Sequence, residues 1–305
     1  MKSICFFSSY FTGERIPYYV KFYLQELNKY FAEVVLLTNR KDLLTAESDF
    51  LKEQNIQLRL YENEGMDFGM WQKALAEFDG AKYNKIGLIN DSCILFKSLK
   101  PFFEWERNAN IDYAGMTATG KITFHIQSYF LVINKKAIPL VTIFFKEKGI
   151  KQTYKGVITN YEIGLSEHLI QNGMTIGGFY DYKANIDINP TFILADELIK
   201  KGCPLIKKKI FSHNYYLGDY LTWFRNDFNI DTRYYVDAIR NSNKGEALID
   251  LEKVMDEVSI DKSDWYIRKY KMGLAVYKFL RSISFLRFLF HQFILLRRKL
   301  RTEEK

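Results

Sequence analysis

Short apolar runs alternate with amphipathic stretches over the first sixty residues. Residues 3–8 form an apolar run with the length of a buried strand, and residues 34–37 form another. A third strand is expected at residues 57–61. Apolar residues recur at helical spacing in residues 18–30, and residues 42–54 are also expected to form a helix. Strands and helices that alternate in this way predict a parallel sheet with helices on its faces.

The same alternation continues along the next hundred residues. Four further elements are expected, namely a helix within residues 66–78, strands at 85–89 and 129–133, and a helix at 161–171. No internal repeat or low-complexity linker interrupts the pattern. We therefore predict one domain of the α/β class over residues 1–225, followed by a helical extension (226–264) and a basic amphipathic tail (265–305).

The positive charge of the chain is concentrated in this tail. The formal net charge is +8 at pH 7, from 44 Lys and Arg against 36 Asp and Glu. Ten of the basic residues, and no acidic residue, lie between Trp265 and Thr302, which leaves 34 basic and 36 acidic side chains elsewhere. Binding to nucleic acid needs positive charge distributed over the binding surface. The near-neutral body therefore argues against nucleic acid as a partner.

The tail also contains an apolar stretch, Leu274 to Leu296, which Lys278, Arg281 and Arg287 interrupt. Charges near the middle of a spanning helix are costly, so we do not expect this stretch to cross a bilayer. We expect a helix that lies on an anionic membrane surface, with Lys and Arg toward the headgroups. A helix that packs on the body or in a dimer is the alternative.

The cysteines and the N-terminus bear on the cellular location. Cys5, Cys93 and Cys203 lie far apart without metal-binding spacing, so we expect free thiols in a reducing compartment. The first apolar run is too short for a secretion signal. Together with the tail, these features predict a cytoplasmic protein that is peripheral at the inner face of the cell membrane.

Polar residues follow the predicted strands at the place where open α/β sheets bind ligands. Ser8, Ser9 and Tyr10 close the first strand, and by position we expect them to contact a nucleotide. The loop after the third strand contains four candidate donor-binding residues, Asn63, Gly65, Asp67 and Gly69. Its glycines permit close approach of a ligand, and the helix that follows suits a diphosphate. An ordinary loop is the alternative.

A second polar cluster, Asn90-Asp91-Ser92, follows the strand at residues 85–89. A carboxylate at the exit of a buried strand is well placed to hold Mg²⁺ or Mn²⁺ against phosphate oxygens. We therefore expect a divalent metal at Asp91, with His213 as a second ligand, although Asp91 that merely caps a turn is the alternative. Lys207 is expected to meet a diphosphate as a point charge, or else to belong to a solvated charge run.

A third cluster supplies candidates for acid–base chemistry and for binding an acceptor. A carboxylate in a partly buried cleft removes the proton from an attacking hydroxyl. Glu162 and Glu167 are five residues apart on a predicted helix, so at most one of them points into a site. A solvated helix with ordinary charges is the alternative. The expected acceptor-binding residues are His125, Gln127, Ser128 and Tyr161, of which His125 is equally compatible with a structural role.

Taken together, these clusters resemble the nucleotide-sugar half of GT-A glycosyltransferases and, more closely, the rhamnan synthesis protein F family. Six short stretches between residues 3 and 212 carry the resemblance. They are N-E-G-M-D-F-G-M-W (63–71), L-I-N-D-S (88–92), H-I-Q-S-Y-F-L-V (125–132), Y-E-I-G-L-S (161–166), N-P-T (189–191) and P-L-I-K-K (204–208). Their order and spacing are what make the resemblance specific.

The resemblance implies a GT-A-like, Rossmann-related fold with a mostly parallel sheet and helices on both faces. It implies transfer of rhamnose or another hexose from a nucleotide donor to a lipid-linked acceptor of a cell-surface polysaccharide. Asn90-Asp91-Ser92 would occupy the place of the D-x-D metal motif, with a neutral side chain in place of one carboxylate. Tyr161-Glu162 and the downstream Leu165 resemble the pattern of inverting enzymes, in which Glu162 would be the catalytic base. If Glu162 is not the base, Asp67 is the next candidate among the carboxylates.

Two other classes of function stay open at this stage. Another nucleotide-sugar reaction, such as hydrolysis or phosphosugar transfer, would use the same clusters. A non-catalytic membrane-associated scaffold or a nucleic-acid binder would instead depend on the basic tail.

Overall fold

The structure is a computed structural model that describes residues 2–11, 13–183 and 189–208. All of these residues belong to one compact unit. The predicted boundaries at residues 225 and 264, the helical extension, the basic tail and His213 lie outside the described residues.

The elements follow one another in an alternating order. In the chain they are β1 (Ser3–Ser8), α1 (Tyr18–Leu27), β2 (Glu33–Thr38), α2 (Thr45–Glu53), β3 (Ile56–Leu60), α3 (Met66–Ala76), a 3₁₀ turn η1 (Gly80–Lys82), β4 (Lys85–Asn90), β5 (Cys93–Leu95), α4 (Lys100–Asn108), β6 (Tyr113–Thr119), β7 (His125–Ile126), β8 (Phe130–Asn134), α5 (Ile138–Lys148), α6 (Tyr154–Val157), a π-helical segment η2 (Ile158–Ile163), α7 (Gly164–Gln171), β9 (Ile176–Tyr182), α8 (Pro190–Ile193), α9 (Ala195–Lys200) and β10 (Leu205–Lys207).

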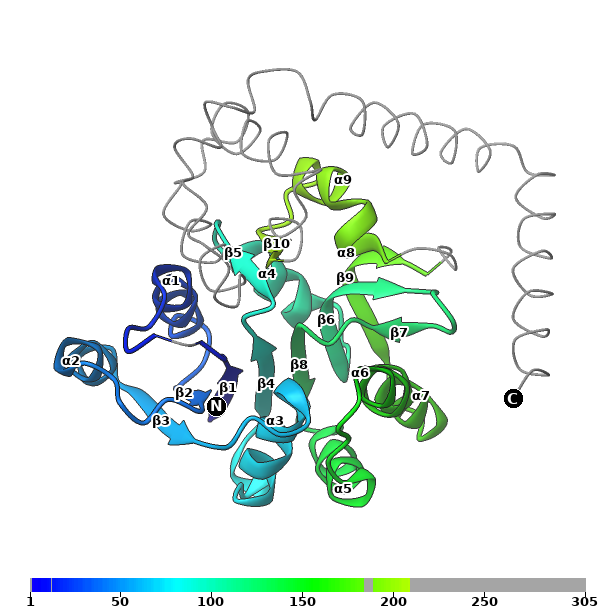
Figure 1. Cartoon of the computed structure of the whole chain (residues 1–305). Helices are drawn as coiled ribbons and strands as arrows, with labels where there is room; N and C mark the ends of the chain where they lie inside the picture. Colours follow the sequence, from blue (N-terminus) through cyan, green and yellow to red (C-terminus); the bar gives the residue numbers. More distant parts are fainter. Residues whose placement is uncertain (1, 12, 184–188, 209–305) are drawn as a thin grey trace, which may run out of the picture. The chain divides into compact units, whose positions relative to one another are not determined.

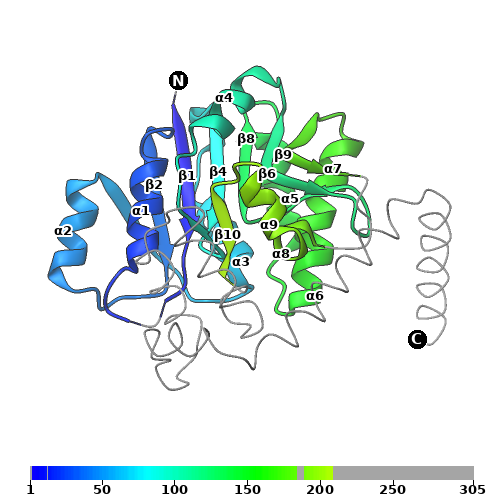
Figure 2. The same cartoon turned by 90° about the horizontal axis from the view of Figure 1, so that it is seen from above.

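An eight-stranded sheet forms the centre of this unit, in the order β3-β2-β1-β4-β8-β6-β7, with β9 also paired to β6. β1 pairs in parallel with β2 and β4, β2 with β3, and β9 with β6. β8 pairs antiparallel with both β4 and β6, and β7 pairs antiparallel with β6. Figure 2 shows β2, β1 and β4 side by side. Within the described residues the sheet is therefore mostly parallel, with β7 and β8 reversed.

One face of the sheet packs against α3, α5 and α7 (Figure 1). Successive side chains of a strand point to opposite faces, and Ile4 and Phe6 of β1 point to this one. They share an apolar core with Trp71 of α3, Phe145 of α5 and Leu165 of α7, all of them buried. The apolar residues that recur at helical spacing in the sequence thus lie on the side of each helix that packs against the sheet.

Helices also cover the opposite face. Phe7 of β1 meets Tyr23 of α1 with ring centroids 5.0 Å apart. Phe130 of β8 meets Phe102 of α4 at 4.8 Å, in an edge-to-face arrangement that aromatic rings favour. With both faces covered, the predicted α/β, GT-A-like fold with a mostly parallel sheet is confirmed.

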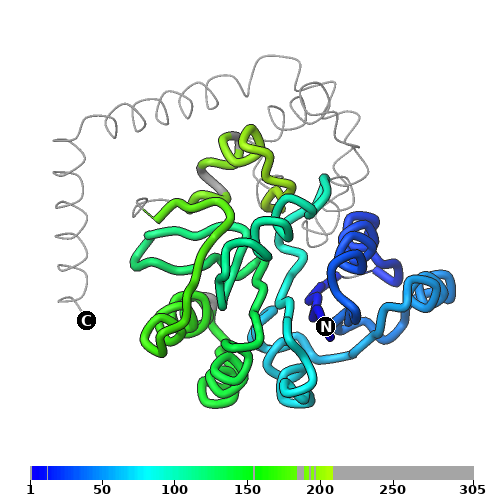
Figure 3. Tube along the Cα trace, turned by 180° about the vertical axis from the view of Figure 1, so that it is seen from behind, coloured from blue at the N-terminus to red at the C-terminus, as the bar shows by residue number. Residues whose placement is uncertain are grey.

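The predicted elements agree with the observed ones to within a few residues at their ends. The first sixty residues build one side of the sheet, residues 113–182 build the other, and β4 lies between them, as the colours of Figure 3 show. Cys5, Cys93 and Cys203 are free thiols, as predicted, and the structure shows that all three are buried. In the described ranges, no helix combines the length and the apolar character that crossing a bilayer requires.

Candidate functional site

The parallel pairing of β1 and β4 brings two of the predicted clusters together. Ser8 at the end of β1 is in register with Asn90 at the end of β4, and the Asp91 backbone N–H donates to the Ser8 carbonyl at 3.1 Å. Ser8, Ser9, Asn90 and Asp91 are all buried. Since buried polar groups need partners, their side chains must find hydrogen bonds at this end of the sheet.

The carboxylate of Asp91 is the centre of the first group of bonds. Its Oδ2 accepts hydrogen bonds from Ser9 Oγ, Tyr19 OH and Lys208 Nζ, each at 2.9 Å. The side chain of Asp91 is 8% exposed and that of Lys208 is 17% exposed, so this is a largely desolvated ion pair. Tyr19 comes from the first turn of α1, so the helix on one face of the sheet is tied to the end of β4.

Asp67, in the first turn of α3, is the centre of the second group. Its Oδ1 accepts from Ser8 Oγ at 3.3 Å, and its Oδ2 accepts from Asn90 Nδ2 at 2.8 Å. Part of its surface stays open, but desolvation by the surrounding protein, followed by the negative charge of Asp91, raises the pKa of Asp67 to about 7. Two carboxylates therefore flank the ends of β1 and β4 from opposite faces of the sheet.

Two lysines reach this end from the last described strand. β10 pairs antiparallel with β5, which directly follows Asn90-Asp91-Ser92. Lys207 Nζ donates to Ser92 Oγ at 2.9 Å, and the Lys208 backbone N–H donates to the Ser92 carbonyl at 2.9 Å. We define the carboxyl-end cluster as the residues held together by these bonds, namely Ser8, Ser9, Tyr19, Asp67, Asn90, Asp91, Ser92, Lys207 and Lys208.

Glu162, in the π-helical segment η2, is the centre of a separate group of bonds. Its Oε2 accepts from the backbone N–H of Ser128 at 2.9 Å and from Ser128 Oγ, and its Oε1 faces His125 Nε2 at 3.5 Å. Burial acts to raise the pKa of Glu162, but His125 and the two donors of Ser128 outweigh it and hold the pKa below its usual value. Glu162 is therefore ionised at neutral pH.

The β8 pairing joins the surroundings of Glu162 to the carboxyl-end cluster. Asn90 N–H donates to the carbonyl of Tyr129 at 3.2 Å, and Tyr129 follows the Ser128 that binds Glu162. Gln127, one residue before Ser128, continues the network. Its Nε2 donates to Asn189 Oδ1 at 3.0 Å, and its Oε1 accepts from Thr117 Oγ1 at 2.7 Å. Glu162 and Asp91 consequently lie at the same end of the sheet.

Some of the predicted site residues are not part of these networks. Tyr161 is buried in the core, where its ring stacks on Phe68 with centroids 5.0 Å apart, so it is not open to an acceptor. Gly69 allows the close approach of its own loop backbone, because a Cβ there would meet the Glu64 carbonyl oxygen at 1.7 Å. Gly65, at φ +67°, likewise sits against Ile150. Asn63 and Tyr10 are exposed, and Tyr10 extends from the end of β1.

Four residues whose side chains take part in these networks were not among the predicted site residues, namely Tyr19, Thr117, Asn189 and Lys208. Lys208 and Asn189 lie within stretches that carry the family resemblance, but of these two stretches only Lys207 is a predicted site residue. Tyr19 gives no signal in the sequence, since it stands among the apolar positions of a helix. Only the fold brings its hydroxyl to Asp91.

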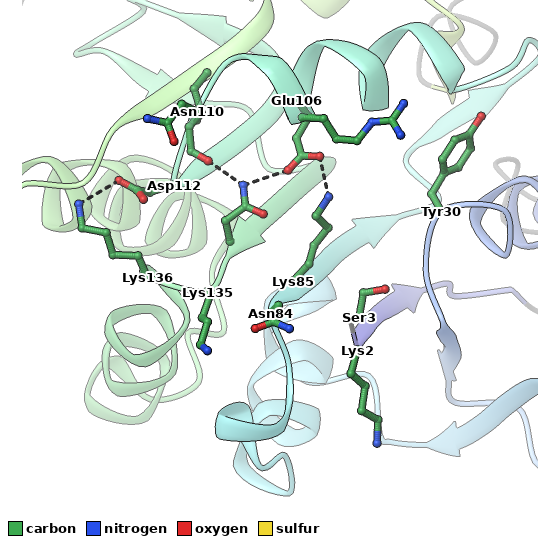
Figure 4. Close-up of a pocket in the computed structure, with 13 residues that line it drawn as sticks. Lys2, Ser3, Tyr30, Asn84, Lys85, Glu106, Asn110, Asp112, Lys135 and Lys136 are labelled. Atoms are coloured by element: carbon green, nitrogen blue, oxygen red, sulfur yellow. Dashed lines mark hydrogen bonds and ion pairs between the residues drawn. The ribbon is translucent and has the colours of Figure 1, made fainter.

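A hollow at the opposite end of the sheet is the other candidate for a binding site (Figure 4). It has a volume of about 500 Å³ and lies at the amino ends of β1 and β4. Both of its acidic side chains are paired, Glu106 with Lys85 at 2.6 Å and Asp112 with Lys136 at 3.4 Å, and Lys2, Arg107 and Lys135 add positive charge to the lining. None of the predicted site residues lines it. We therefore place the functional site at the carboxyl end, where open α/β sheets bind ligands.

Comparisons with known proteins give several chains to which this one is similar. The virulence protein VirA of Vibrio anguillarum is 25% identical over 224 residues, which cover 59% of this chain and 70% of that protein. A putative nucleotide-diphospho-sugar transferase from Desulfovibrio desulfuricans has 12% identity and a TM-score of 0.43, over 86% of this chain and 100% of that one. A 4-diphosphocytidyl-2C-methyl-D-erythritol synthase from Anaerococcus prevotii has 14% identity and a TM-score of 0.41, over 61% and 92%.

A protein-family model also matches most of the chain. The model of rhamnan synthesis protein F matches residues 34–289, which is well over half of the chain. The matched range contains the Asn63–Trp71 loop, the Asn90-Asp91-Ser92 cluster, Glu162 and both lysines of the carboxyl-end cluster. The chain therefore belongs to the rhamnan synthesis protein F family.

Proposed function

We propose that the protein is an inverting glycosyltransferase that binds a nucleotide-sugar donor at the carboxyl-end cluster. The sugar, rhamnose or another hexose, would pass to a lipid-linked acceptor of a cell-surface polysaccharide. Membership of the rhamnan synthesis protein F family supports a glycosyltransferase. The identity of the sugar, the acceptor and the stereochemical course are the parts that go beyond the family.

One observation carries the proposal, namely that hydrogen bonds join all six of the sequence stretches that resemble the family. Asp67 binds Asn90, Asn90 binds Tyr129, and Ser128 binds Glu162. Gln127 binds Asn189, and Ser92 binds Lys207. Residues of these stretches that are up to 117 positions apart thus meet at one end of the sheet. A functional site explains this convergence better than packing does, because most of these bonds are between polar side chains.

The charges of the cluster suit the donor. Lys207 and Lys208 place two ammonium groups at the end of β4, where a diphosphate would need positive charge. The ring of Tyr10 is 45% exposed at the end of β1 and offers a stacking surface for a base. The nucleotide would therefore lie over the ends of β1 and β4, and its sugar would point toward Glu162.

Glu162 is the proposed catalytic base. The acceptor hydroxyl oxygen forms a bond to the anomeric carbon, the bond from that carbon to the diphosphate breaks, and the electron pair leaves with the diphosphate. The hydroxyl proton passes to Glu162. Oε1 is the oxygen that would receive it, since Oε2 is held by Ser128, whereas His125 Nε2 stands 3.5 Å from Oε1. A positioned base contributes roughly 10²–10⁴ to the rate of such a step.

Calorimetric titration of the purified protein with dTDP and UDP sugars tests the proposal, followed by a transfer assay with acceptor extracted from membranes. We expect saturable binding of one nucleotide class and transfer that depends on it. Absence of binding to every nucleotide, together with salt-sensitive binding to DNA, would instead support the non-catalytic alternative. Release of the free sugar without any transfer would support hydrolysis.

The basic tail is proposed to hold the enzyme near a lipid-linked acceptor. Each Lys or Arg near an anionic surface contributes about 1 kcal/mol to membrane binding. We expect the intact chain to sediment with vesicles that contain anionic lipid and a chain that lacks residues 265–301 to remain in the supernatant. Equal sedimentation of the two proteins would contradict this role of the tail.

A further inference from the structure

The GT-A resemblance implies a divalent metal at Asp91, but the side chains around Asp91 do not fit one. Asp91 Oδ2 already accepts three hydrogen bonds at 2.9 Å, one of them from the ammonium of Lys208. A metal on this carboxylate would stand beside that ammonium, and the two positive charges would repel each other at short range. The carboxylate is thus matched by a cation that the chain itself supplies.

The neighbours of Asp91 do not complete a metal site either. Asn90 and Ser92 are neutral, and Asn90 uses its amide N–H on Asp67 and its Oδ1 on the backbone N–H of Ser92. Ser92 Oγ accepts from Lys207. Across the residues that the structure describes, no three or more His, Cys, Asp and Glu side chains gather in a way that would hold a metal. Mg²⁺ prefers carboxylate oxygens, and here Asp91 Oδ2 and both carboxylate oxygens of Asp67 already accept hydrogen bonds.

Both lysines keep donors available after these bonds are made. A lysine ammonium has three N–H donors. Lys208 directs two of them to Asp91 and Tyr19 OH, and Lys207 directs one to Ser92 Oγ. The remaining three have no acceptor among residues 2–11, 13–183 and 189–208. Their positions are further supported by aromatic rings, since Lys207 lies 5.3 Å from the ring centroid of Tyr129 and Lys208 lies 5.2 Å from that of Tyr19.

We propose that the ammonium groups of Lys207 and Lys208 bind the donor diphosphate in place of a divalent metal, with Asp91, Tyr19 and Ser92 as the residues that position them. The inference rests on the proposed function and specifies how that site recognises its donor. As the bond to the sugar breaks, negative charge increases on the leaving diphosphate, and two fixed ammonium groups stabilise it. Asp91 is then a positioning residue, because it acts through Lys208 and not through direct contact with the donor.

Nucleotide binding with and without metal tests the inference. The native protein is titrated by calorimetry with dTDP, UDP and GDP, once with excess EDTA and once with Mg²⁺ or Mn²⁺. We expect the tightest of these nucleotides to bind with the same affinity in both buffers, and inorganic pyrophosphate to compete with it. Affinity that appears only with metal would overturn the inference and leave the proposed function standing. If no nucleotide binds in either buffer, the proposed function fails, and the inference fails with it.

Substitutions locate the effect at the lysine pair. Lys207→Ala leaves the bonds of Asp91 intact, so it is the variant least prone to unfold, and Lys208→Arg retains the charge beside Asp91. We expect Lys207→Ala to weaken nucleotide binding by roughly ten- to a hundredfold in EDTA, as for the loss of one hydrogen bond to a charged group. Lys135→Ala removes one exposed positive charge at the other end of the sheet and serves as the control. Equal affinities of Lys207→Ala, Lys208→Arg and Lys135→Ala for the nucleotide would contradict the inference.

Discussion

Both ends of the parallel strands carry charged side chains of both signs, but the two ends hold them differently. At the amino end, Lys2 and Lys136 are 50% and 62% exposed, and each pairs with one carboxylate beside it. Glu106 there is buried, but Lys85 and Asn134 satisfy its carboxylate. At the carboxyl end, Asp91 and Lys208 are largely buried, and their bonds link β1, α1, β4 and the segment after β10.

The end of the sheet that has a hollow is therefore not the end that has groups free to bind a charged ligand. The amino end has the hollow of about 500 Å³, but its buried charges are matched pairs and its unmatched ones are solvated. The carboxyl end gathers buried polar groups from distant parts of the chain and still leaves lysine donors for a ligand. Buried polar networks are costly unless they are satisfied, so their placement at the carboxyl end indicates where the chain binds its substrate.

The largest expected effect is on transfer by the Glu162→Gln variant. Because glutamine cannot take up the hydroxyl proton, we expect the rate of transfer to fall by roughly 10²–10⁴ while donor affinity is retained. Glu167→Gln, five residues along the same helical region and exposed, is the control and should keep its rate. Similar rates for the two variants in a radiolabelled-sugar assay would exclude Glu162 as the base and make Asp67 the next candidate.

A second prediction compares the stability of one ion pair at each end. Lys208→Ala leaves the buried carboxylate of Asp91 without its cation and should lower the free energy of unfolding by about 3 kcal/mol. Lys136→Ala breaks a pair whose lysine is 62% exposed, and Asp112 keeps its hydrogen bonds from Thr175, so this change should cost about 0–1 kcal/mol. Urea denaturation of the two variants measures the difference directly. Equal losses would mean that the two ends are not held as differently as we describe.

The pH dependence of stability should have opposite signs at the two ends. The folded protein raises the pKa of Asp67 to about 7, so this group stabilises the fold below its unfolded pKa, and the contribution is lost as the pH rises through about 7. Asp67→Asn should therefore become more stable relative to the native protein as the pH rises from about 4 to 7. Above that range the difference should level off.

For Asp112, at the amino end, the pKa is shifted in the opposite direction to that of Asp67. Burial acts to raise the pKa of Asp112, but the hydrogen bonds from Thr175 and the charge of Lys136 lower it overall. A carboxyl with a lowered pKa contributes stability above its unfolded pKa and loses it as the pH falls through the folded pKa. Asp112→Asn should thus lose stability relative to the native protein as the pH rises through about 4. Urea titrations at several pH values that give parallel curves for the two variants would refute the assignment.

The smallest expected effect on nucleotide affinity is that of substitutions in the hollow at the amino end. Arg107 and Lys135 are exposed there, and their charges are far enough from the carboxyl-end cluster to be screened by salt. We expect Arg107→Ala and Lys135→Ala to change nucleotide affinity by less than about twofold at physiological salt. A tenfold loss in either variant would show that the nucleotide reaches the amino end.

The sequence predicts the positions of the strand ends but not the contacts between them. The strands β1, β2 and β4 are recognisable because a buried parallel strand is a continuous apolar run followed by polar residues. β6 is also buried throughout, yet its Tyr-Ala-Gly-Met-Thr-Ala-Thr sequence lacks the branched apolar residues that indicate such a strand. The pattern of apolar residues therefore does not predict the strand β6.

The site was predicted best where a residue's role depends on its own strand. Ser8, Asn90 and Asp91 end their strands, so their meeting follows from parallel pairing. Tyr161 is predicted to bind the acceptor and is the neighbour of Glu162 in η2, but consecutive residues of a helix point in different directions, and Tyr161 faces the core. Tyr19 donates to a carboxylate 72 residues away, and no local pattern contains that information.

Hydrogen exchange with and without bound nucleotide tests the central claim most directly, because it reports on both ends of the sheet in one experiment. The nucleoside diphosphate that binds most tightly is added to the full chain, and amide exchange is followed by mass spectrometry. We predict slower exchange in the segments that contain Ser9, Asp67, Asp91 and Lys207, with no change around Lys85, Arg107 and Lys136. Protection at the amino end, or uniform exchange at both ends despite saturating nucleotide, would contradict the account.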